Sequence, residues 1–256
     1  MSWADEKIAR PMGYAHAVLF PRARDAIWAY QKVLDGLIYL PENICPQVLT
    51  GLTYDDYALR PVNDETGLAD IPIQLYGYRQ KILGLLEIDP LMTGWGLRPI
   101  CESSIVSFGY KKFISIGYGG AFLTNNKNLA GEMQEWSHWP FDEDAGPSGA
   151  LKFFLDRFLE FRGDGFKKIH KWDSALGDIL PRIPMEQVIP WRVMRRVPNG
   201  KRDAVVKELR ARGIPVGTNY PPLAGSNKWG DEVINFFQDC EEARLAADLI
   251  DGVLNG

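Results

Sequence analysis

Two adjacent lysines lie between an apolar stretch and a cluster of glycines, in the segment SFGYKKFISIGYGG at residues 107–120. A lysine becomes a nucleophile or a Schiff-base former when desolvation or neighbouring cations lower the pKa of its ammonium group. Apolar residues flank this pair, and Gly117, Gly119 and Gly120 allow the backbone to approach a bound group closely. The glycine spacing is that of neither a dinucleotide-binding loop nor a P-loop. The segment indicates a reactive lysine, and a solvated surface hairpin is the alternative.

The first half of the chain reads as alternating strands and helices. Apolar runs predict strands at the start of 38–49 and over 70–78, 82–90, 100–108 and 119–126, with helices over 23–37 and 127–139. The continuous apolar run before Asp89 is typical of a strand buried in an α/β sheet. In the first helix, one apolar face is predicted from Ile27, Tyr30, Leu34 and Leu37.

A stretch rich in proline, glycine and acids at residues 140–152 marks the expected domain boundary. We place a large domain at 1–145 and a small α+β domain at 146–256. The small domain should contain helices in 151–161, 170–180 and 240–254 and strands in 190–197 and 215–225. Between those strands we predict a helix capped by Asn199, with Val205, Val206 and Leu209 buried and Gly213 as its left-handed stop. The pattern predicts a two-domain α/β protein.

Composition excludes several classes of function. The formal net charge is −4 and no basic stripe is present, so no nucleic-acid partner is expected. The most basic stretch, residues 191–203, reads as a solvated strand and turn, with nucleic-acid binding as the lesser alternative. The N-terminus has early acids and no long apolar run, which predicts neither a signal peptide nor a membrane span. We therefore expect a cytoplasmic protein.

Cysteine and histidine are too sparse to suggest a metal site. The three cysteines, Cys45, Cys101 and Cys240, are far apart and form no CxxC, so reduced thiols are expected. The three histidines have no ligand neighbours at useful spacing, which predicts no metal. The same scarcity argues against a nucleophile that depends on histidine.

The lysine segment resembles the cofactor-lysine segment of the DegT-type sugar aminotransferases. These are pyridoxal-phosphate (PLP) enzymes of the fold-type-I aspartate aminotransferase superfamily, and they aminate nucleotide-linked keto sugars. Their pattern is Ser-Phe, three residues, Lys, four residues and Gly-Glu-Gly-Gly, which aligns with residues 107–120. The resemblance implies that Lys112, and not Lys111, carries the Schiff base. It also implies that Ser107 binds the cofactor phosphate.

Two further stretches of the large domain are similar to the same family. Residues 18–34 resemble its first helix, whose N-terminus binds the phosphate, so Ala23, Arg24 and Asp25 would contribute mostly through backbone N–H groups. An ordinary amphipathic helix is the alternative. The segment LLEIDP resembles the strand whose aspartate keeps the pyridinium nitrogen protonated, which would be the role of Asp89. A turn aspartate before a proline is the alternative there.

In the second half, residues 202–225 are similar to the family's small-domain helix, strand and Tyr-Pro-Pro-Leu loop. Tyr220 would then border the substrate, although a tyrosine packed against its two prolines is equally compatible. The resemblance implies a type I fold, with a mainly parallel sheet in the large domain and an α+β small domain. It also implies a homodimer, because this family builds its active site at the subunit interface.

The resemblance implies amino transfer from an amino acid such as glutamate to a keto sugar, expected to be nucleotide-linked. Three features depart from the family pattern. Tyr118 replaces the usual glutamate, Gly109-Tyr110 replaces His-Pro, and the chain is short and lacks the Arg-x-Asn-Tyr-Arg stretch that reaches the partner subunit. Two alternatives therefore stay open. One is another PLP reaction on a sugar, such as dehydration, and the other is a cofactor-less relative that acts as a binding or assembly partner.

Overall fold

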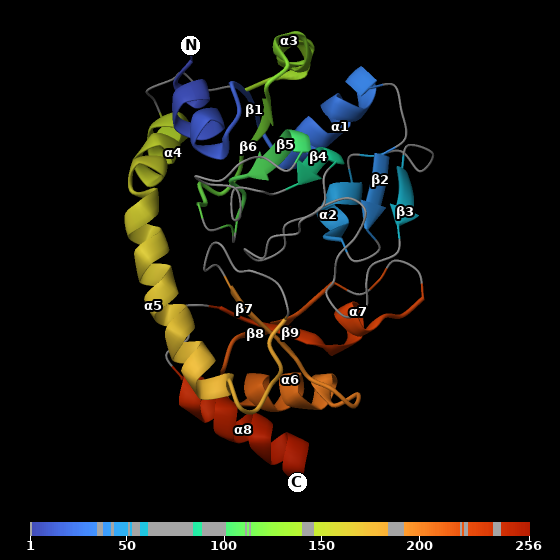
Figure 1. Cartoon of the computed structure of the whole chain (residues 1–256), viewed down its shortest axis with the longest axis vertical. Coiled ribbons are helices and arrows are strands. Elements are labelled where there is room, and N and C mark those ends of the chain that lie inside the picture. The colour runs from blue at the N-terminus through green and yellow to red at the C-terminus, as the bar shows by residue number, and fades with distance from the viewer. Residues whose placement is uncertain are drawn as a thin grey trace.

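A four-stranded sheet organises the first half of the chain in the computed structural model (Figure 1). Its strands lie in the order β1 (His16–Phe20), β6 (Gly120–Thr124), β5 (Cys101–Ser107) and β4 (Gly84–Ile88). β6 is antiparallel to both β1 and β5, whereas β4 and β5 are parallel. In this part of the chain the sheet is therefore mixed, and not mainly parallel as predicted. The loop at 108–119 is the reason, because a short return joins antiparallel neighbours and a parallel neighbour needs a crossover.

The description covers most, but not all, of the chain. The described residues are 2–34, 38–41, 44–50, 52, 57–60, 84–88, 101–110, 112, 114–139, 146–183, 192–220, 222, 225–237 and 242–256. The predicted strand at 70–78, Asp89, Lys111 and Cys240 lie outside them. Cys45 and Cys101, the described cysteines, are not joined in a disulfide. Within the described ranges, no helix combines the length and apolarity needed to cross a bilayer.

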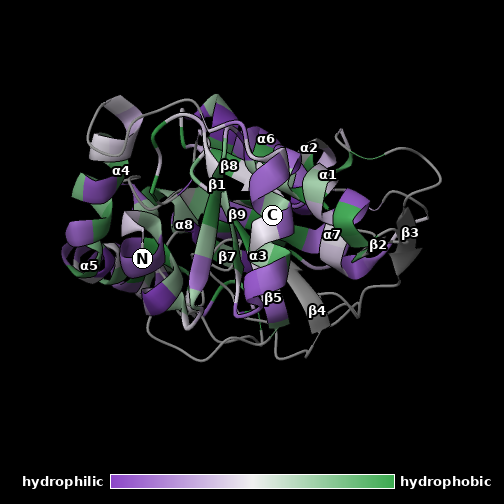
Figure 2. Ribbon diagram, turned by 90° about the horizontal axis from the view of Figure 1, so that it is seen from above, coloured by the Kyte–Doolittle hydropathy of each residue, from purple (hydrophilic) through white to green (hydrophobic). Residues whose placement is uncertain are grey.

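Helices α1 (Ala23–Leu34) and α3 (Lys127–Trp136) pack on one face of the large sheet. Both are amphipathic, with hydrophobic and hydrophilic residues side by side in Figure 2. The predicted inward positions Ile27 and Tyr30 of α1 are buried with Phe122 of β6. Leu34 was predicted on the same face but is 44% exposed. It is the last residue of α1 and lies beyond the part of the helix that packs on the sheet.

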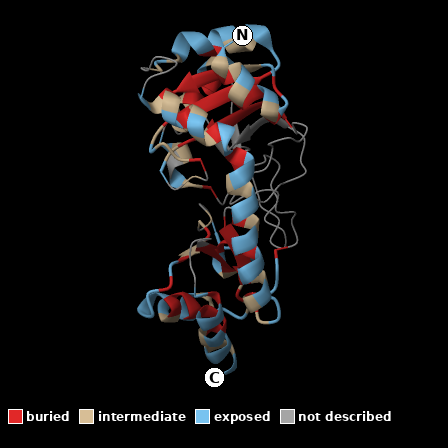
Figure 3. Ribbon diagram, turned by 90° about the vertical axis from the view of Figure 1, so that its left-hand side faces the viewer, coloured by how far each residue is buried: buried red, intermediate tan, exposed pale blue. Residues whose placement is uncertain are grey.

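The opposite face of the large sheet is covered by a π-helix (Asp5–Ala9), a 3-10 helix (Arg10–Met12) and α4 (Gly146–Asp156). Successive residues of a strand point to opposite faces, so Phe122 contacts the α1 layer and Leu123 contacts this second layer. Figure 3 shows the buried strands between helices whose outer surfaces are exposed. Burial on both faces explains why β6 is apolar along nearly its whole length.

A small parallel pair lies beside this sheet. It consists of β2 (Ile38–Pro41) and β3 (Tyr57–Arg60), and the short helix α2 (Pro46–Leu49) lies between them in sequence. The predicted apolar strand after the first helix is thereby confirmed. α2 contacts α1, so this pair extends the α1 side of the molecule.

Helix α5 (Phe158–Leu176) leads from the first half of the chain into the second (Figure 1). There β7 (Arg192–Arg196), β9 (Val233–Phe237) and β8 (Val216–Thr218) form an antiparallel sheet, preceded at β9 by α7 (Lys228–Glu232). One face of it packs on α5, α6 (Arg202–Ala211) and α8 (Ala243–Asn255). The predicted inward residues Val205, Val206 and Leu209 are buried in this core.

The two ends of α6 agree only in part with the sequence pattern. Asn199 is not the N-cap: the helix begins after Lys201, and no side chain caps it. Asn199 instead has a left-handed φ of 63° beside Gly200, because the Pro-Asn-Gly sequence forms a turn of its own. Gly213 has a φ of 77°, and its N–H donates to the Arg210 carbonyl at 3.0 Å, so the predicted helix stop is confirmed.

Candidate functional site

Lys112 lies in the loop that joins β5 to β6, residues 108–119. The loop is closed at its base, where the Phe108 N–H donates to the Gly119 carbonyl at 3.0 Å. Phe108 and Ile114 are both buried in the core formed with the N-terminal helices. The half-buried Lys112 therefore lies between two buried anchors in the sequence, although Tyr110 in the same loop is 78% exposed.

Ser107 is the last residue of β5 and lies directly opposite Gly120, the first residue of β6. Ile105, two residues earlier, packs in the core under α1, so the alternation of the strand directs Ser107 to the α1 face as well. Its Oγ accepts the Gly109 N–H at 3.3 Å. The hydroxyl thus lies where the lysine loop leaves the sheet.

The start of α1 lies against the same pair of strand ends. A Cβ built on Gly120 would lie 2.6 Å from both the backbone N and the Cα of Ala23, closer than real Cβ contacts occur. The Gly119 N–H donates to the Pro21 carbonyl at 2.7 Å, just before the helix. Since Gly120 also faces Ser107, the structure brings together two predicted phosphate-binding elements that are far apart in the sequence.

The first turn of α1 has the electrostatics of an anion site with one opposing carboxylate. N–H groups in the first turn of a helix lack intrahelical acceptors, and with the helix dipole they favour a negative group. The Arg24 guanidinium donates to the Thr50 hydroxyl at 3.4 Å, which leaves its backbone as the predicted contributor. Burial raises the pKa of the Asp25 carboxyl, and the neighbouring Arg22 opposes this shift.

Two other predicted residues are not placed at this cluster. Asp89 lies outside the described residues; the strand before it ends at Ile88, which pairs with Ile105, two positions before Ser107. Tyr220 follows β8 in the second half of the chain and is half-buried. The roles of both residues stay predictions.

An aromatic pair at the base of the lysine loop was not predicted from the sequence. The rings of Tyr118 and Trp139 stack with centroids 6.1 Å apart, and the Trp139 indole N–H donates to the Ser148 hydroxyl of α4 at 3.3 Å. Burial raises the pKa of the Tyr118 phenol. The residue that replaces the family's glutamate therefore packs the loop against α4. No local pattern signals a contact between residues that are so far apart in sequence.

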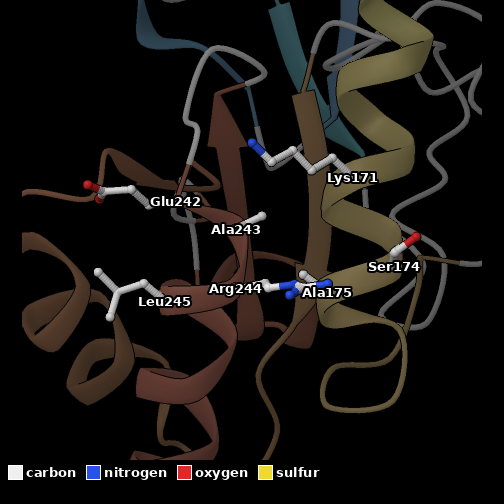
Figure 4. Close-up of a pocket in the computed structure, with 7 residues that line it drawn as sticks. All are labelled: Lys171, Ser174, Ala175, Glu242, Ala243, Arg244 and Leu245. Atoms are coloured by element: carbon white, nitrogen blue, oxygen red, sulfur yellow. The ribbon is translucent and has the colours of Figure 1, made fainter.

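A pocket of about 450 Å³ lies elsewhere, between α5 and the start of α8 (Figure 4). It is lined by Lys171, Ser174, Ala175, Glu242, Ala243, Arg244 and Leu245. None of these residues belongs to the lysine loop or to the start of α1, so this pocket is separate from the candidate site. In the described part of the chain, no three His, Cys, Asp or Glu side chains gather to hold a metal ion.

No protein-family model and no curated protein sequence matches the chain, but solved structures match nearly all of it. PseC of Helicobacter pylori, an aminotransferase in pseudoaminic acid biosynthesis, is 14% identical with a TM-score of 0.79, and 98% of this chain covers 90% of it. A DegT DnrJ EryC1 StrS aminotransferase from Brucella abortus is 16% identical (TM-score 0.72; 98% and 88% covered). Spr1654 of Streptococcus pneumoniae, a candidate sugar aminotransferase in its PLP form, is 14% identical (TM-score 0.78; 98% and 90% covered).

The chain has the fold of the DegT-type sugar aminotransferases. The match in fold agrees with the resemblance seen in the lysine segment, and it covers both halves of the chain. This sugar-aminotransferase fold is shortened here, because nearly the whole chain spans 88% of the Brucella protein. The sequence identity to these neighbours is only 14–16%. The likeness therefore shows the fold of the chain, and its reaction has to be inferred from its own residues.

Proposed function

We propose that this protein is a PLP-dependent aminotransferase acting on a sugar. The observation that carries the proposal is the meeting of Ser107, the start of α1 and the lysine loop at one end of the sheet. We further propose an amino acid, with glutamate as the expected donor, and a nucleotide-linked keto sugar as the acceptor. The structural neighbours support an aminotransferase acting on a sugar, since one of them is a candidate sugar aminotransferase in its PLP form.

The residues present fit a phosphate-bearing aldehyde. The backbone N–H groups of Ala23 and Arg24 at the start of α1, together with the Ser107 hydroxyl, would bind its phosphate. The Asp25 N–H donates to the Arg22 carbonyl at 3.1 Å and is not counted among them. Lys112 would bind its aldehyde carbon through Nζ, and Asp89 would hold a proton on its ring nitrogen. When bound, PLP supplies an electron sink for the carbon that loses a proton.

In this reaction Lys112 would have two tasks. Its Nζ would hold the cofactor at rest and would be free for proton transfer once the donor amine is bound. The free Nζ would then serve as the base that takes a proton from the donor carbon, and afterwards as the acid that returns it. The buried side chains of Phe108 and Ile114 would limit the movement of the loop that carries Lys112.

A second candidate function is a cofactor-less partner of another protein. Its support is Tyr118, which fills the family's glutamate position and packs on Trp139 at the base of the lysine loop. We also retain, as predictions, a homodimer and the division into domains 1–145 and 146–256. Sedimentation and limited proteolysis address these two points.

The decisive experiment combines PLP absorbance, borohydride trapping and peptide mass spectrometry. Wild-type protein should show a visible absorbance band with PLP, and borohydride should fix the cofactor on Lys112. Lys112→Ala should lose both signals, and amino transfer should fall by about 10²- to 10⁴-fold, as expected for loss of a positioned base. Lys111→Ala is the matched control and should keep them. Undiminished transfer by Lys112→Ala contradicts the proposed function, and a colourless wild type favours the cofactor-less partner.

A further inference from the structure

Gly120 occupies the crossing point of three elements at the candidate site. As the first residue of β6, it pairs with Phe20 of β1 on one side and with Ser107 of β5 on the other. The chain leaves β1 at Phe20 and begins α1 at Ala23, so the helix starts directly beside this pair of strands. Gly120 therefore adjoins both the start of the helix and the serine.

The space beside Gly120 is filled by protein. A Cβ there would meet the Ala23 N and Cα at 2.6 Å and the Ala23 Cβ at 3.0 Å. The sequence suggested that Gly120 leaves space for a bound group. In the structure this space is occupied by Ala23 at the start of α1. Gly119 differs, since its Cβ would lie 3.4 Å from the ring of Trp139, and Gly117 faces open space.

We propose that Gly120 is a positioning residue that sets the separation between the first turn of α1 and the Ser107 hydroxyl. This inference rests on the proposed function, because the group held between them is the cofactor phosphate. The contact is between backbone atoms, which cannot rotate away as a flexible side chain would. A methyl group at position 120 would push the start of α1 outward and leave Ser107 in place, so the two could no longer share one phosphate.

The effect is specific to the phosphate end of the ligand. Lys112 is held by the separate anchors Phe108 and Ile114, which Gly120 does not contact in the strand pairing. Binding of the aldehyde should therefore survive a displacement of α1. The ratio of affinities for PLP and for pyridoxal, which lacks the phosphate, separates this role from a general loss of structure.

The test is a spectroscopic titration of Gly120→Ala with PLP and with pyridoxal. We expect PLP to bind about 10- to 100-fold more weakly, the size of lost charge-assisted hydrogen bonds, and pyridoxal to change less than about threefold. Gly131→Ala on α3 is the matched control, since a Cβ there meets nothing within 4 Å, and it should leave both affinities unchanged.

A second variant covers the case in which Gly120→Ala does not fold. Ala23→Gly introduces no clash but loosens the first residue of α1, so it should lower the PLP-to-pyridoxal ratio in the same direction by about two- to threefold. An unchanged ratio in the folded variants overturns the inference and leaves the proposed function intact. A wild-type protein that binds neither compound overturns both.

Discussion

At the end of the large sheet, α1 meets β6 through backbone atoms, because Gly120 places no side chain between them. In the second half of the chain, α5 meets β9 through two large rings, Trp172 and Phe236, whose centroids are 4.3 Å apart. The first contact fixes the position of a helix end and buries little area. The second removes a large apolar area from water. The two contacts thus differ in kind: the first is a close approach of backbone atoms, and the second is a stack of large apolar rings.

The basic side chains of the two regions also differ in their surroundings. In the small sheet the guanidinium of Arg195 is buried and donates to the Asp173 carboxylate of α5 and to the Met194 carbonyl. The Asp173 side chain is partly exposed, so Arg195 is the partner that loses most of its hydration, and removal of Asp173 would leave a buried charge without this ion pair. At the lysine loop, local backbone bonds are joined by the stacking of Tyr118 on Trp139. Lys112 in this loop is half-buried.

The largest expected effect concerns the small sheet. Trp172→Ala should lower the free energy of unfolding by about 3–5 kcal/mol, because it leaves a cavity beside Phe236. Urea denaturation measures this loss. Trp136→Ala is the control, since Trp136 is 39% exposed and should cost less than about 1 kcal/mol. If both variants lose the same amount, the ring stack contributes no more than a half-exposed ring, and the comparison is wrong.

A smaller effect is expected for a substitution at the end of the large sheet. It should change the affinity for PLP and not the stability of the fold. Ser107→Ala should weaken PLP binding about tenfold, the value of one hydrogen bond to a charged group, with an unfolding free energy changed by less than about 1 kcal/mol. Ser115→Ala, which removes a similar local bond to a loop N–H, is the control. Loss of stability in Ser107→Ala without loss of PLP affinity would assign Ser107 to packing.

The smallest effect is a change in the free energy of unfolding that is expected only at alkaline pH. Burial, with a lesser contribution from the charge of Glu102, raises the pKa of Tyr30 to about 12. The folded protein then holds this proton more tightly than the unfolded chain, so the free energy of unfolding should fall as the pH rises from about 10 to about 12. Phenolate absorbance measures the titration, and Tyr30→Phe should flatten this part of the stability profile. A profile identical in both proteins would show that the core under α1 is open to water.

Three of the four described strands of the large sheet were predictable because each is an apolar run bounded by polar or turn residues, whereas β1 was not predicted. The runs at 82–90, 100–108 and 119–126 contain β4, β5 and β6, and the loop between the last two carries the predicted lysine. Local patterns failed where two local preferences competed. Asn199 is a good cap residue, but proline before it and glycine after it favour a turn more strongly.

The candidate site was predictable in its residue types and not in its assembly. Ser107 and Lys112 follow from a short motif, whereas the contact of Gly120 with Ala23 joins residues that no local period connects. Strand order decides that contact, and strand order depends on long-range pairing that a single sequence does not display. The packing of Tyr118 on Trp139 escaped prediction for the same reason.

The reversed direction of β6 has a consequence for the order of folding. Pairing β5 with β6 closes only the loop at 108–119, whereas pairing β1 with β6 closes the whole segment 21–119. Because the entropy cost of closure grows with loop length, the lysine hairpin should form first and β1 should join later. The start of α1 then reaches Gly120 only in that late step. A ligand that binds both α1 and the hairpin would therefore stabilise the completed sheet and not its precursor.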